Sequence, residues 1–526
     1  MYEIELKFCV PEFTQANLDK QVRTKTATQQ RLAAYYFDTA ARALAKAGMA
    51  LRVRFENGNW VQTLKTAGDG VAKRGEFNQV RNLAPHADAS TIRPDLTVFD
   101  APEAQAALAR IMPLADLDHA LQLQYLTDVT RTQRCIKKNA SQIELAYDVG
   151  TIAKGTPSTA DTDDQRALHE LEFELLNDEP NGLSDLVEVA KVWCKRHKLY
   201  LSTVTKAERG GLLLAGKRYP AATKADLSQL TFTSDISQFA FLQHVVNNCL
   251  AQILPNASAI ADGSPDGNHV HQLRVGIRRL RTALKIFKNF TDAIDPNWIL
   301  VLKHTFSLLG EYRDREILQI KTQPMLEAQG APHVEWTFDG IDVLPIDAVR
   351  ANDFQIVLLE LIKFAHLPAP ADSPAARPAV RKKLKKLFKK IAIASEHYAT
   401  LDTDQQHDVR KDLKTLRYVS EFAAPLFVEN DKTEKTKTDK SKGKANASAK
   451  GKKPAKLAAF LQYLEPAQDM LGEYNDNVVG QAHYAARAAT DPNALFAVGW
   501  FSGRQAESAA RCALSLQGIK NAPVFW

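Results

Sequence analysis

The pattern of apolar and polar residues changes once along the chain. Over roughly the first 209 residues, short segments such as Glu3–Lys7 and His169–Leu175 alternate charged and apolar residues. This alternation predicts β-strands with one charged and one apolar face, and turn sequences such as Asn57-Gly58 favour antiparallel hairpins. From about Leu230, apolar residues recur with the 3.6-residue period of an amphipathic helix. We therefore expect a multidomain α and β protein with an antiparallel β-domain and a C-terminal all-α domain.

The charged faces of the expected strands carry opposite signs. Arg52 and Arg54 share a face of one segment, whereas Glu170, Glu172 and Glu174 share a face of another. Exposed on a flat sheet, such ion pairs would contribute only about 0–1 kcal/mol each. Enclosed by a barrel, the carboxylates would hold a hard divalent cation and the basic groups would bind an oligophosphate. The pattern therefore favours a charged cavity inside a closed sheet.

These segments resemble the CYTH, or triphosphate tunnel metalloenzyme, superfamily. Glu3–Lys7 has the form E-x-E-x-K with which that family opens. The similarity covers about residues 1–209 and is to the inorganic triphosphatase branch, through YYFDT (35–39), LRVRFENG (51–58), LKTAG (64–68), KRGEFN (73–78), TDVTRT (127–132), SQIELAYDVG (141–150) and HELEFELLNDE (169–179). The resemblance implies an eight-stranded antiparallel tunnel with flanking helices, a need for Mg²⁺ or Mn²⁺, and hydrolysis of a phosphoanhydride bond.

The resemblance also implies roles for individual residues of this sequence. It implies metal binding by a set of carboxylates: Glu3, Glu5, Asp148, Glu170, Glu172 and Glu174. It implies catalysis by Lys7, Arg52, Arg54 and Lys65, and substrate binding by Arg74, Arg131 and Lys206. Arg134 is a weaker candidate, because it is out of phase with Arg131 on a regular strand. Either a second metal ion or a tunnel carboxylate would activate the attacking water, and the sequence leaves both open.

Two segments of the expected helical domain repeat each other. His271–Phe287 aligns without gaps with His407–Ala423, and Leu309–Asp314 corresponds to Leu471–Asp476. In each copy a histidine and basic residues recur at i, i+3, i+7 and i+10, which places them on one helical face. They are His271, Arg274, Arg278 and Arg281 in the first copy, and His407, Arg410, Lys414 and Arg417 in the second.

The repeated segments resemble the CHAD domain, the conserved histidine α-helical domain, over about residues 230–516. That family is associated with inorganic polyphosphate, so the resemblance implies that the repeated histidines and basic residues bind this polyanion. Two pseudo-symmetric helical bundles would bring the two basic faces to one groove. Residues 210–229 are then expected to link the two domains.

The net charge of the 526-residue chain is +7, and one segment accounts for it. Asp431–Lys456 holds ten lysines and three acidic residues, so the remaining 58 basic and 58 acidic residues balance. Because this segment lacks large apolar residues, it is expected to be a disordered insert in the helical domain. It also explains why the repeat spacing differs, since 39 residues separate His271 from Gly310 and 65 separate His407 from Gly472.

The remaining features favour a cytoplasmic protein. The five cysteines are scattered and form no C-x-x-C pair, which suits a reducing compartment. The N-terminus lacks the basic start and apolar core of a signal peptide. The uncharged stretch Ile236–Ala261 is interrupted by amide and imidazole side chains, so it predicts an amphipathic helix rather than a membrane span.

The leading functional hypothesis is metal-dependent hydrolysis of inorganic tripolyphosphate to pyrophosphate and phosphate, with a helical domain that binds inorganic polyphosphate. One alternative is a tunnel enzyme acting on thiamine triphosphate or cyclising a nucleotide. Another is a non-catalytic polyphosphate-binding or targeting protein. Nucleic acid is a less favoured partner, because aromatic residues are not interleaved with the basic residues of the repeated helices. No membrane partner is expected, and the sequence does not indicate an oligomeric state.

Overall fold

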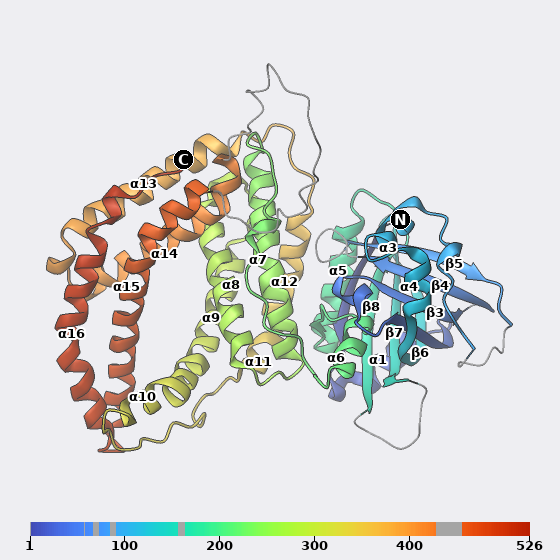
Figure 1. The fold of residues 1–526 in the computed structure, drawn as a ribbon, viewed down its shortest axis with the longest axis horizontal. Coiled ribbons are helices and arrows are strands. Elements are labelled where there is room, and N and C mark those ends of the chain that lie inside the picture. The colour runs from blue at the N-terminus through green and yellow to red at the C-terminus, as the bar shows by residue number, and fades with distance from the viewer. Residues whose placement is uncertain (1, 57, 67–72, 85–90, 156–163, 428–454) are drawn as a thin grey trace. The chain divides into compact units, whose positions relative to one another are not determined.

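The computed structural model describes residues 2–56, 58–66, 73–84, 91–155, 164–427 and 455–526. The chain packs into two compact units, each built from segments distant in sequence (Figure 1). The first, which we call the sheet unit, comprises Met1–Thr223, Ile253–Leu273 and Pro345–His366. The second, the helical unit, comprises Lys224–Gln252, Arg274–Leu344 and Leu367–Trp526.

The sheet unit is organised by one antiparallel sheet whose neighbouring strands follow the order β5-β4-β3-β2-β6-β7-β8-β1-β9. The bounds are β1 Tyr2–Cys9, β2 Thr28–Thr39, β3 Ala50–Glu56, β4 Asn59–Thr66, β5 Lys73–Arg81, β6 Leu121–Lys138, β7 Ser141–Lys154, β8 Gln165–Leu175 and β9 Tyr200–Leu201. An additional antiparallel pairing joins β1 to β5, so strands β1 to β8 form a closed circuit.

The number of strands differs from the predicted eight. The described residues form nine strands, because the two-residue β9 pairs with the end of β1 through Phe8 and Cys9. Two residues are too few to show an alternating pattern, which is why the sequence does not reveal β9. The broader prediction, an N-terminal antiparallel sheet followed by a helical region, is confirmed.

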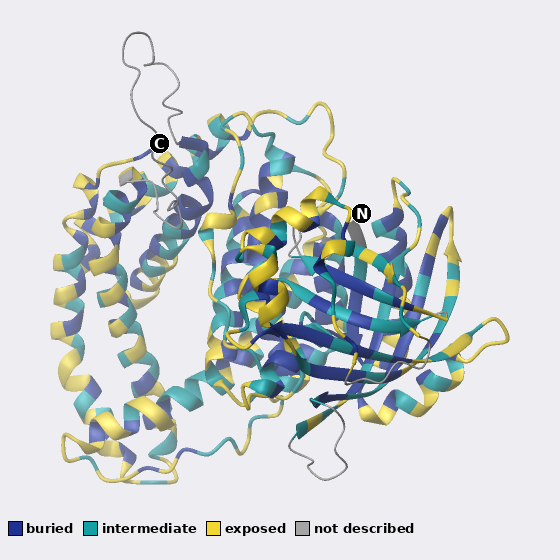
Figure 2. Ribbon diagram, turned by 45° about the vertical axis from the view of Figure 1, so that its right-hand side comes forward, coloured by how far each residue is buried: buried dark blue, intermediate teal, exposed yellow. Residues whose placement is uncertain are grey.

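Helix α5 (Gly182–His197) covers the apolar side of β1 and β8. Phe173 of β8 packs edge-on against Phe8 of β1 at 5.7 Å and against Trp193 of α5 at 6.2 Å between ring centroids. Phe8 and Phe173 are fully buried, and Figure 2 shows buried residues in dark blue along the strands of the sheet. Phe8 and Phe173 are buried under α5. Because side chains alternate along a strand, the charged residues next to them on β1 and β8 point to the opposite side of the sheet.

The other helices of the sheet unit flank the sheet or follow it. They are α1 Glu12–Val22, α2 Ala43–Lys46, α3 Pro102–Ala109, α4 Leu114–Ala120, α6 Lys206–Leu214, α11 Pro345–Arg350 and α12 Asn352–Ala365. A capping box begins α6, since the Thr205 side chain accepts from the Glu208 amide and Glu208 accepts from the Thr205 amide. Helix α6 continues to Leu214, so it extends into the first residues of the segment expected to be a linker.

Helices build the helical unit, and two of them are shared with the sheet unit. The bounds are α7 Gln238–Ala261, α8 Gly267–Ile286, α9 Pro296–Ile317, α10 Gln323–Glu327, α13 Ala376–Glu396, α14 Thr403–Ala423, α15 Ala455–Arg487 and α16 Ala494–Leu516. Part of α7 and the start of α8 pack with the sheet unit. Among the described residues of the helical unit, Phe241, Phe287 and Phe290 pack together in its core.

Most of the predicted lysine-rich insert lies outside the described residues. Its last two residues, Ala455 and Lys456, form the start of α15. Both residue types have high helix propensity and directly precede the apolar Leu457, which explains why the helix begins there. Within the part of the chain that the structure describes, every helix is too short or too polar to span a bilayer.

Gly150 of β7 offers a test of how tightly the sheet is packed. A Cβ atom there would lie 2.0 Å from the Asp128 carbonyl oxygen and 2.6 Å from Val129 Cα, both backbone atoms of β6. We expect Gly150→Ala to lower the free energy of unfolding by on the order of 1–3 kcal/mol, measured by denaturant unfolding. Gly472→Ala is the control, because its Cβ would meet nothing within 4 Å. Equal stability of the two variants would contradict this packing.

Candidate functional site

Charged residues of three neighbouring strands lie opposite one another on the side of the sheet that faces away from α5. On β1 and β8, Lys7 lies opposite Glu172, and Glu5 lies opposite Glu174. On β7 and β8, Asp148 lies opposite Glu170. In an antiparallel sheet, residues directly opposite each other point to the same face, so these side chains form one continuous charged surface.

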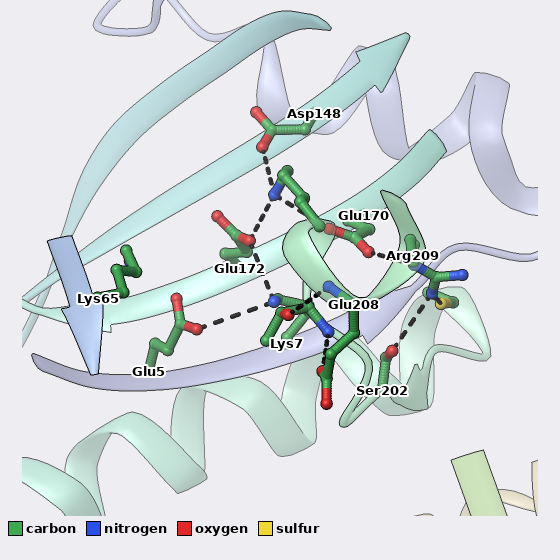
Figure 3. A network of polar contacts seen from close by, with 12 residues as sticks. Glu5, Lys7, Lys65, Asp148, Glu170, Glu172, Ser202, Glu208 and Arg209 are labelled. Carbon is green, nitrogen blue, oxygen red and sulfur yellow. Dashed lines mark hydrogen bonds and ion pairs between the residues drawn. The ribbon is translucent and has the colours of Figure 1, made fainter. Parts of the chain in front are cut away.

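A lysine from α6 inserts its ammonium group between three of these carboxylates. Lys206 Nζ lies 2.9 Å from Asp148, 3.0 Å from Glu170 and 2.7 Å from Glu172. Arg131 of β6 adds a bidentate pair with Asp148, both contacts at 2.7 Å, and a 2.7 Å contact with Glu172. Figure 3 shows these carboxylates turned toward a common centre. We call the group of Asp148, Glu170, Glu172 and Lys206 the Lys206 cluster.

Asp148, Glu172 and Lys206 of the Lys206 cluster favour their charged forms although they are buried. Burial alone would raise the pKa of Asp148, but Lys206 and Arg131 outweigh burial and lower that pKa. The same cations hold the pKa of Glu172 well below its usual range against the effect of burial. Burial opposes the charge on Lys206, yet Glu172, Asp148 and Glu170 raise its pKa well above the ordinary value. Asp148 and Glu172 are therefore anionic at neutral pH.

A second group of carboxylates is poorly compensated. Glu5, Glu174 and Glu144 lie opposite one another across β1, β8 and β7. Burial, together with repulsion from Glu144 and Glu5, raises the pKa of Glu174 to about 7. Burial also raises the pKa of Glu144. Lys7 Nζ approaches Glu5 only to 3.9 Å. A bound cation would relieve this repulsion, so we call these three residues the acidic row.

Basic residues from the other strands face the acidic row. Lys65 of β4 lowers the pKa of Glu174 on β8, although β4 and β8 are not neighbours in the sheet. Such an influence between distant strands places both side chains in the interior that the sheet encloses. Burial and repulsion from Arg52 and Arg131 lower the pKa of Arg54 to about 10. An anion bound near Arg54 would relieve that repulsion, just as a cation would relieve the acidic row.

Glu76 of β5 holds two of these cations. Its carboxylate lies 2.8 Å from Lys65 Nζ and 3.7 Å from Arg52 Nη2. Arg54 pairs instead with Glu56 of its own strand. Burial lowers the pKa of Arg52, but Tyr36 and Glu76 outweigh it and leave that pKa raised. The basic groups are therefore charged and oriented before any ligand binds.

The structure brings most of the predicted tunnel residues together. The charged interior contains Glu5, Lys7, Arg52, Arg54, Lys65, Arg131, Asp148, Glu170, Glu172, Glu174 and Lys206. Glu3 and Arg74 lie opposite each other on β1 and β5, but their side chains are outside the described part of the structure. Arg134 lies elsewhere, over the ring of Trp193 at 5.3 Å, as its phase predicted.

Three members of the site are absent from the predicted set. Glu144 has a detectable signal, because it is in phase with Asp148 on β7. Glu76 becomes recognisable only once the register places it opposite Lys65. Arg209 of α6 donates from Nε to Glu170 Oε1 at 3.0 Å. It lies on a helix, where strand alternation gives no information.

In the helical unit, the first repeated helix gathers its arginines around one aromatic ring. Arg274, Arg278 and Arg281 of α8 lie over the ring of Phe306 at 4.2, 5.2 and 5.5 Å from its centroid. Arg274 Nη1 also donates to the Phe306 carbonyl at 2.6 Å. Gly310 of α9 leaves room for this arrangement, because a Cβ there would lie 2.4 Å from Arg274 Nη1. In the first copy the glycine therefore makes room for the arginine, whereas a Cβ at Gly472 in the second copy would meet nothing within 4 Å.

The basic residues of α8 and α14, one helix from each repeat copy, repel one another. Burial, followed by repulsion from Arg278 of α8 and Arg410 of α14, lowers the pKa of Lys414 to about 7. Burial is also the main cause of the lowered pKa of Arg410, and Arg278 adds to it. Basic residues of both copies thus crowd one region of the helical unit. We call Arg274, Arg278, Arg281, Arg410, Lys414 and Arg417 the basic cluster.

The histidines of the repeat occupy different settings. His407 lines a small pocket between α14 and α15 with Arg410, Tyr474 and Asn475. Arg417 of the same helix donates to Glu421 at 3.0 Å and to Gln468 at 2.9 Å. His271 lies in the part of α8 that packs with the sheet unit. Because Arg274 follows one helical turn later on α8, the grouping of His271 with the basic cluster stays a prediction.

Comparison with known proteins identifies both parts of the chain. Residues 1–210 match the family model of the CYTH domain, and residues 244–440 match that of the CHAD domain. The chain carries a CYTH domain followed by a CHAD domain. The inorganic triphosphatase of Haemophilus influenzae is 29% identical over 220 residues, which cover 40% of this chain and 55% of that protein. The chain thus matches about half the length of this relative.

Two solved structures show more distant likeness. The CHAD domain of the plant Ricinus communis has a TM-score of 0.44 at 22% identity, covering 58% of this chain and 99% of that one. A Hippeastrum protein, named for adenylyl cyclase and described as having a dominant triphosphatase activity, has a TM-score of 0.30 at 18% identity. Its match covers 41% of this chain and 98% of that one.

The CYTH family is metal-dependent, and the side chains present here fit a hard divalent cation. The acidic row and the Lys206 cluster supply carboxylate oxygens only, the ligands that Mg²⁺ and Mn²⁺ prefer. Among the described residues, no group of three acidic, histidine or cysteine side chains is arranged as a metal site. The Lys206 ammonium lies between the carboxylates of the Lys206 cluster, whereas the carboxylates of the acidic row repel one another. A cation would thus bind by joining the acidic row or by competing with Lys206.

The Lys206 cluster predicts a pH-dependent loss of stability when its cation is removed. Asp148 and Glu172 have folded-state pKa values below their unfolded ones, so their pairing stabilises the fold at neutral pH and is lost as pH falls through those lower values. Lys206→Met should lower the free energy of unfolding by on the order of 3–5 kcal/mol at pH 7. The deficit should shrink in acid, where the carboxylates protonate.

The measurement is denaturant unfolding of both proteins in neutral and in acidic buffer. Lys217→Met is the matched control, because Lys217 is exposed just beyond α6. The control should match the wild type at both pH values. A Lys206→Met deficit that stays constant with pH would contradict the electrostatic explanation.

Proposed function

We propose that the CYTH domain hydrolyses inorganic tripolyphosphate to pyrophosphate and phosphate with Mg²⁺ or Mn²⁺. The supporting observation is that one enclosed interior holds both a repelling acidic row and repelling arginines. Glu174 there has a raised pKa of about 7, and Arg54 has a lowered pKa of about 10. A metal cation would relieve the repulsion within the acidic row, and a phosphate anion would relieve the repulsion between the arginines. The relative named inorganic triphosphatase supports the choice of substrate.

The residues that would hold the cation are the carboxylates of the acidic row and of the Lys206 cluster, with Glu3 as the remaining candidate. A bound divalent cation would neutralise part of the phosphate charge. The chain's own cations bind and orient the rest of the substrate. Arg52 and Arg54 of β3 and Lys65 of β4 would contact phosphate oxygens. In the structure these cations pair with Glu76 and Glu56.

Hydrolysis spreads negative charge over the transferred phosphoryl group and the departing pyrophosphate. Cations that are fixed in advance stabilise this charge without having to reorganise. Lys7 is only 8% exposed and lies 3.7 Å from Glu172, so it is held on the same charged surface. Because Lys7 and Arg131 are largely buried, their charges interact more strongly than they would in bulk water.

We further propose that the CHAD domain binds inorganic polyphosphate through the basic cluster. Like charges are crowded there, as the lowered pKa of Lys414 shows, and a polyanion would relieve the repulsion. Burial and the neighbouring Arg278 and Arg313 also lower the pKa of Arg274, to about 10. A long chain with one charge per phosphate suits a cluster drawn from two helices better than a compact ligand does.

Glu5→Gln tests the enzymatic proposal, because it keeps the shape of the side chain and removes its charge. We expect hydrolysis of tripolyphosphate to fall roughly a hundredfold, measured as phosphate release with Mg²⁺ and with Mn²⁺. Glu103→Gln makes the same charge change on the exposed first turn of α3 and should leave the rate unchanged. Full activity of a folded Glu5→Gln protein would refute the assignment. If the wild-type protein released phosphate only from thiamine triphosphate or nucleotides, the proposed substrate would be wrong.

Arg278→Gln tests the binding proposal, because Arg278 acts on basic residues of both repeat copies. We expect the affinity of the Arg278→Gln protein for long polyphosphate to fall about tenfold, the loss expected from removing one charge-assisted contact. Lys386→Gln removes the same charge from an exposed position of α13 and should have a smaller effect. Affinities are measured at two salt concentrations, since polyanion binding weakens as salt rises. Equal losses in the two variants would mean that binding depends on net charge alone.

A further inference from the structure

Both oxygens of the Glu170 carboxylate are held by cations from the same helix. Lys206 at the start of α6 lies 3.0 Å from Glu170 Oε2, and Arg209 Nε donates to Glu170 Oε1 at 3.0 Å. Figure 3 shows Arg209 beside Glu170, with Ser202 near its guanidinium. Glu170 is fully buried, so its direction depends on these two contacts. Arg209 is therefore one of two cations that orient this proposed metal ligand.

Arg209 in turn has a second carboxylate partner. Its Nη1 lies 3.4 Å from Asp262 Oδ2, and its Nη2 donates to Cys9 Sγ at 3.1 Å and to Ser202 Oγ at 3.4 Å. Burial raises the pKa of the Cys9 thiol to about 11, so this sulfur is neutral. The charge of Arg209 is thus balanced by two anions, Glu170 inside the sheet and Asp262 at the end of α7.

Asp262 is held in place by its surroundings. It directly follows α7, and its amide donates to the Ser258 carbonyl at 2.9 Å. Gly263 comes next with a φ of +94°, a conformation that suits glycine and ends the helix. Arg350 of α11 donates to the carbonyl of Ala261 at 2.8 Å. The backbone on both sides of Asp262 is therefore fixed within the sheet unit.

The position of Asp262 in the sequence gives this contact its significance. The CYTH match ends at residue 210, and the CHAD match covers residues 244–440. Asp262 lies in the segment Ile253–Leu273, which packs with the sheet unit although it belongs to the CHAD match. The CHAD sequence thus supplies a charged residue to a chain of contacts that ends at a carboxylate of the CYTH site.

We infer that Asp262 is a positioning residue for Glu170 and acts through Arg209. The inference rests on the proposed metal-dependent triphosphatase activity. Without Asp262, the Arg209 guanidinium has a single anionic partner and moves toward Glu170. The closer ion pair neutralises more of the Glu170 charge and keeps that carboxylate turned toward Arg209. Glu170 then becomes a poorer ligand for a cation. The catalytic site of the CYTH domain is accordingly complete only when residues of the CHAD sequence are present.

The test uses the full chain and the variants Asp262→Asn and Asp262→Glu. Binding of Mn²⁺ alone is measured by titration calorimetry, and tripolyphosphate hydrolysis by phosphate release at varied metal concentration. Asp262→Asn should weaken Mn²⁺ binding about tenfold, within the range known for residues that orient metal ligands, and should raise the metal concentration needed for half-maximal rate. Asp262→Glu keeps the charge and should recover part of both losses.

Glu360→Gln is the matched control for a structural role. Glu360 of α12 pairs with Lys191 of α5 and lies 2.7 Å from Lys363, so its loss breaks another contact of the sheet unit without reaching a tunnel carboxylate. This variant should lose thermal stability and keep wild-type Mn²⁺ affinity. Loss of stability with unchanged Mn²⁺ affinity in Asp262→Asn as well would overturn the inference.

The two proposals fail in different ways. A wild-type chain that binds Mn²⁺ but releases no phosphate from tripolyphosphate would refute the proposed substrate, and the calorimetric comparison would still decide the role of Asp262. If Asp262→Asn does not fold, Asp262→Ser decides instead, since it also removes the carboxylate that pairs with Arg209. Wild-type Mn²⁺ affinity and normal kinetics in a folded Asp262→Ser protein would then refute the positioning role.

Discussion

The compensation of buried negative charge by Lys206 is the interaction on which the rest of the site depends. Asp148 and Glu170 are fully buried, and removing each carboxylate from water costs several kcal/mol. Strands alone do not offset that cost, because the register places these acids opposite one another. The ammonium of Lys206, delivered by a helix that begins at a capping box, lies within 3.0 Å of both. The charged interior therefore requires α6 as much as it requires the sheet.

The two halves of the chain use repulsion between like charges in different ways. The CYTH domain sets an acidic row against arginines in one interior, so it is suited to a cation and an anion that arrive together. The CHAD domain gathers cations from two helices and is suited to a polyanion alone. In both places the strain is visible before a ligand is present, in the raised pKa of Glu174 and the lowered pKa of Lys414. In the proposed function, ligand binding would relieve the repulsion between like charges at both places.

Strand alternation made much of the fold and of the charged interior predictable. The period of two fixes which residues share a face, so Glu170, Glu172 and Glu174 could be grouped without knowing the neighbouring strands. Pairings between distant segments could not be predicted. Arg209 and Asp262 are 53 residues apart, and the amphipathic pattern of α7 shows which face is apolar but not what that face contacts. Glu76 likewise needed the register with Lys65, and β9 is too short to leave a pattern.

The assignment of segments to the sheet unit has a consequence for synthesis on the ribosome. Lys191 of α5 meets Glu360 of α12 across 169 residues, and the Leu201 amide of β9 donates to Gln355 across 154. At about 5–20 residues per second, those partners emerge roughly ten seconds or more after the last strand. The nascent CYTH domain spends this interval with part of its surface uncovered. Fusion to the helical domain therefore links the maturation of the two domains in time, and a chain interrupted before residue 366 would leave the first domain unfinished.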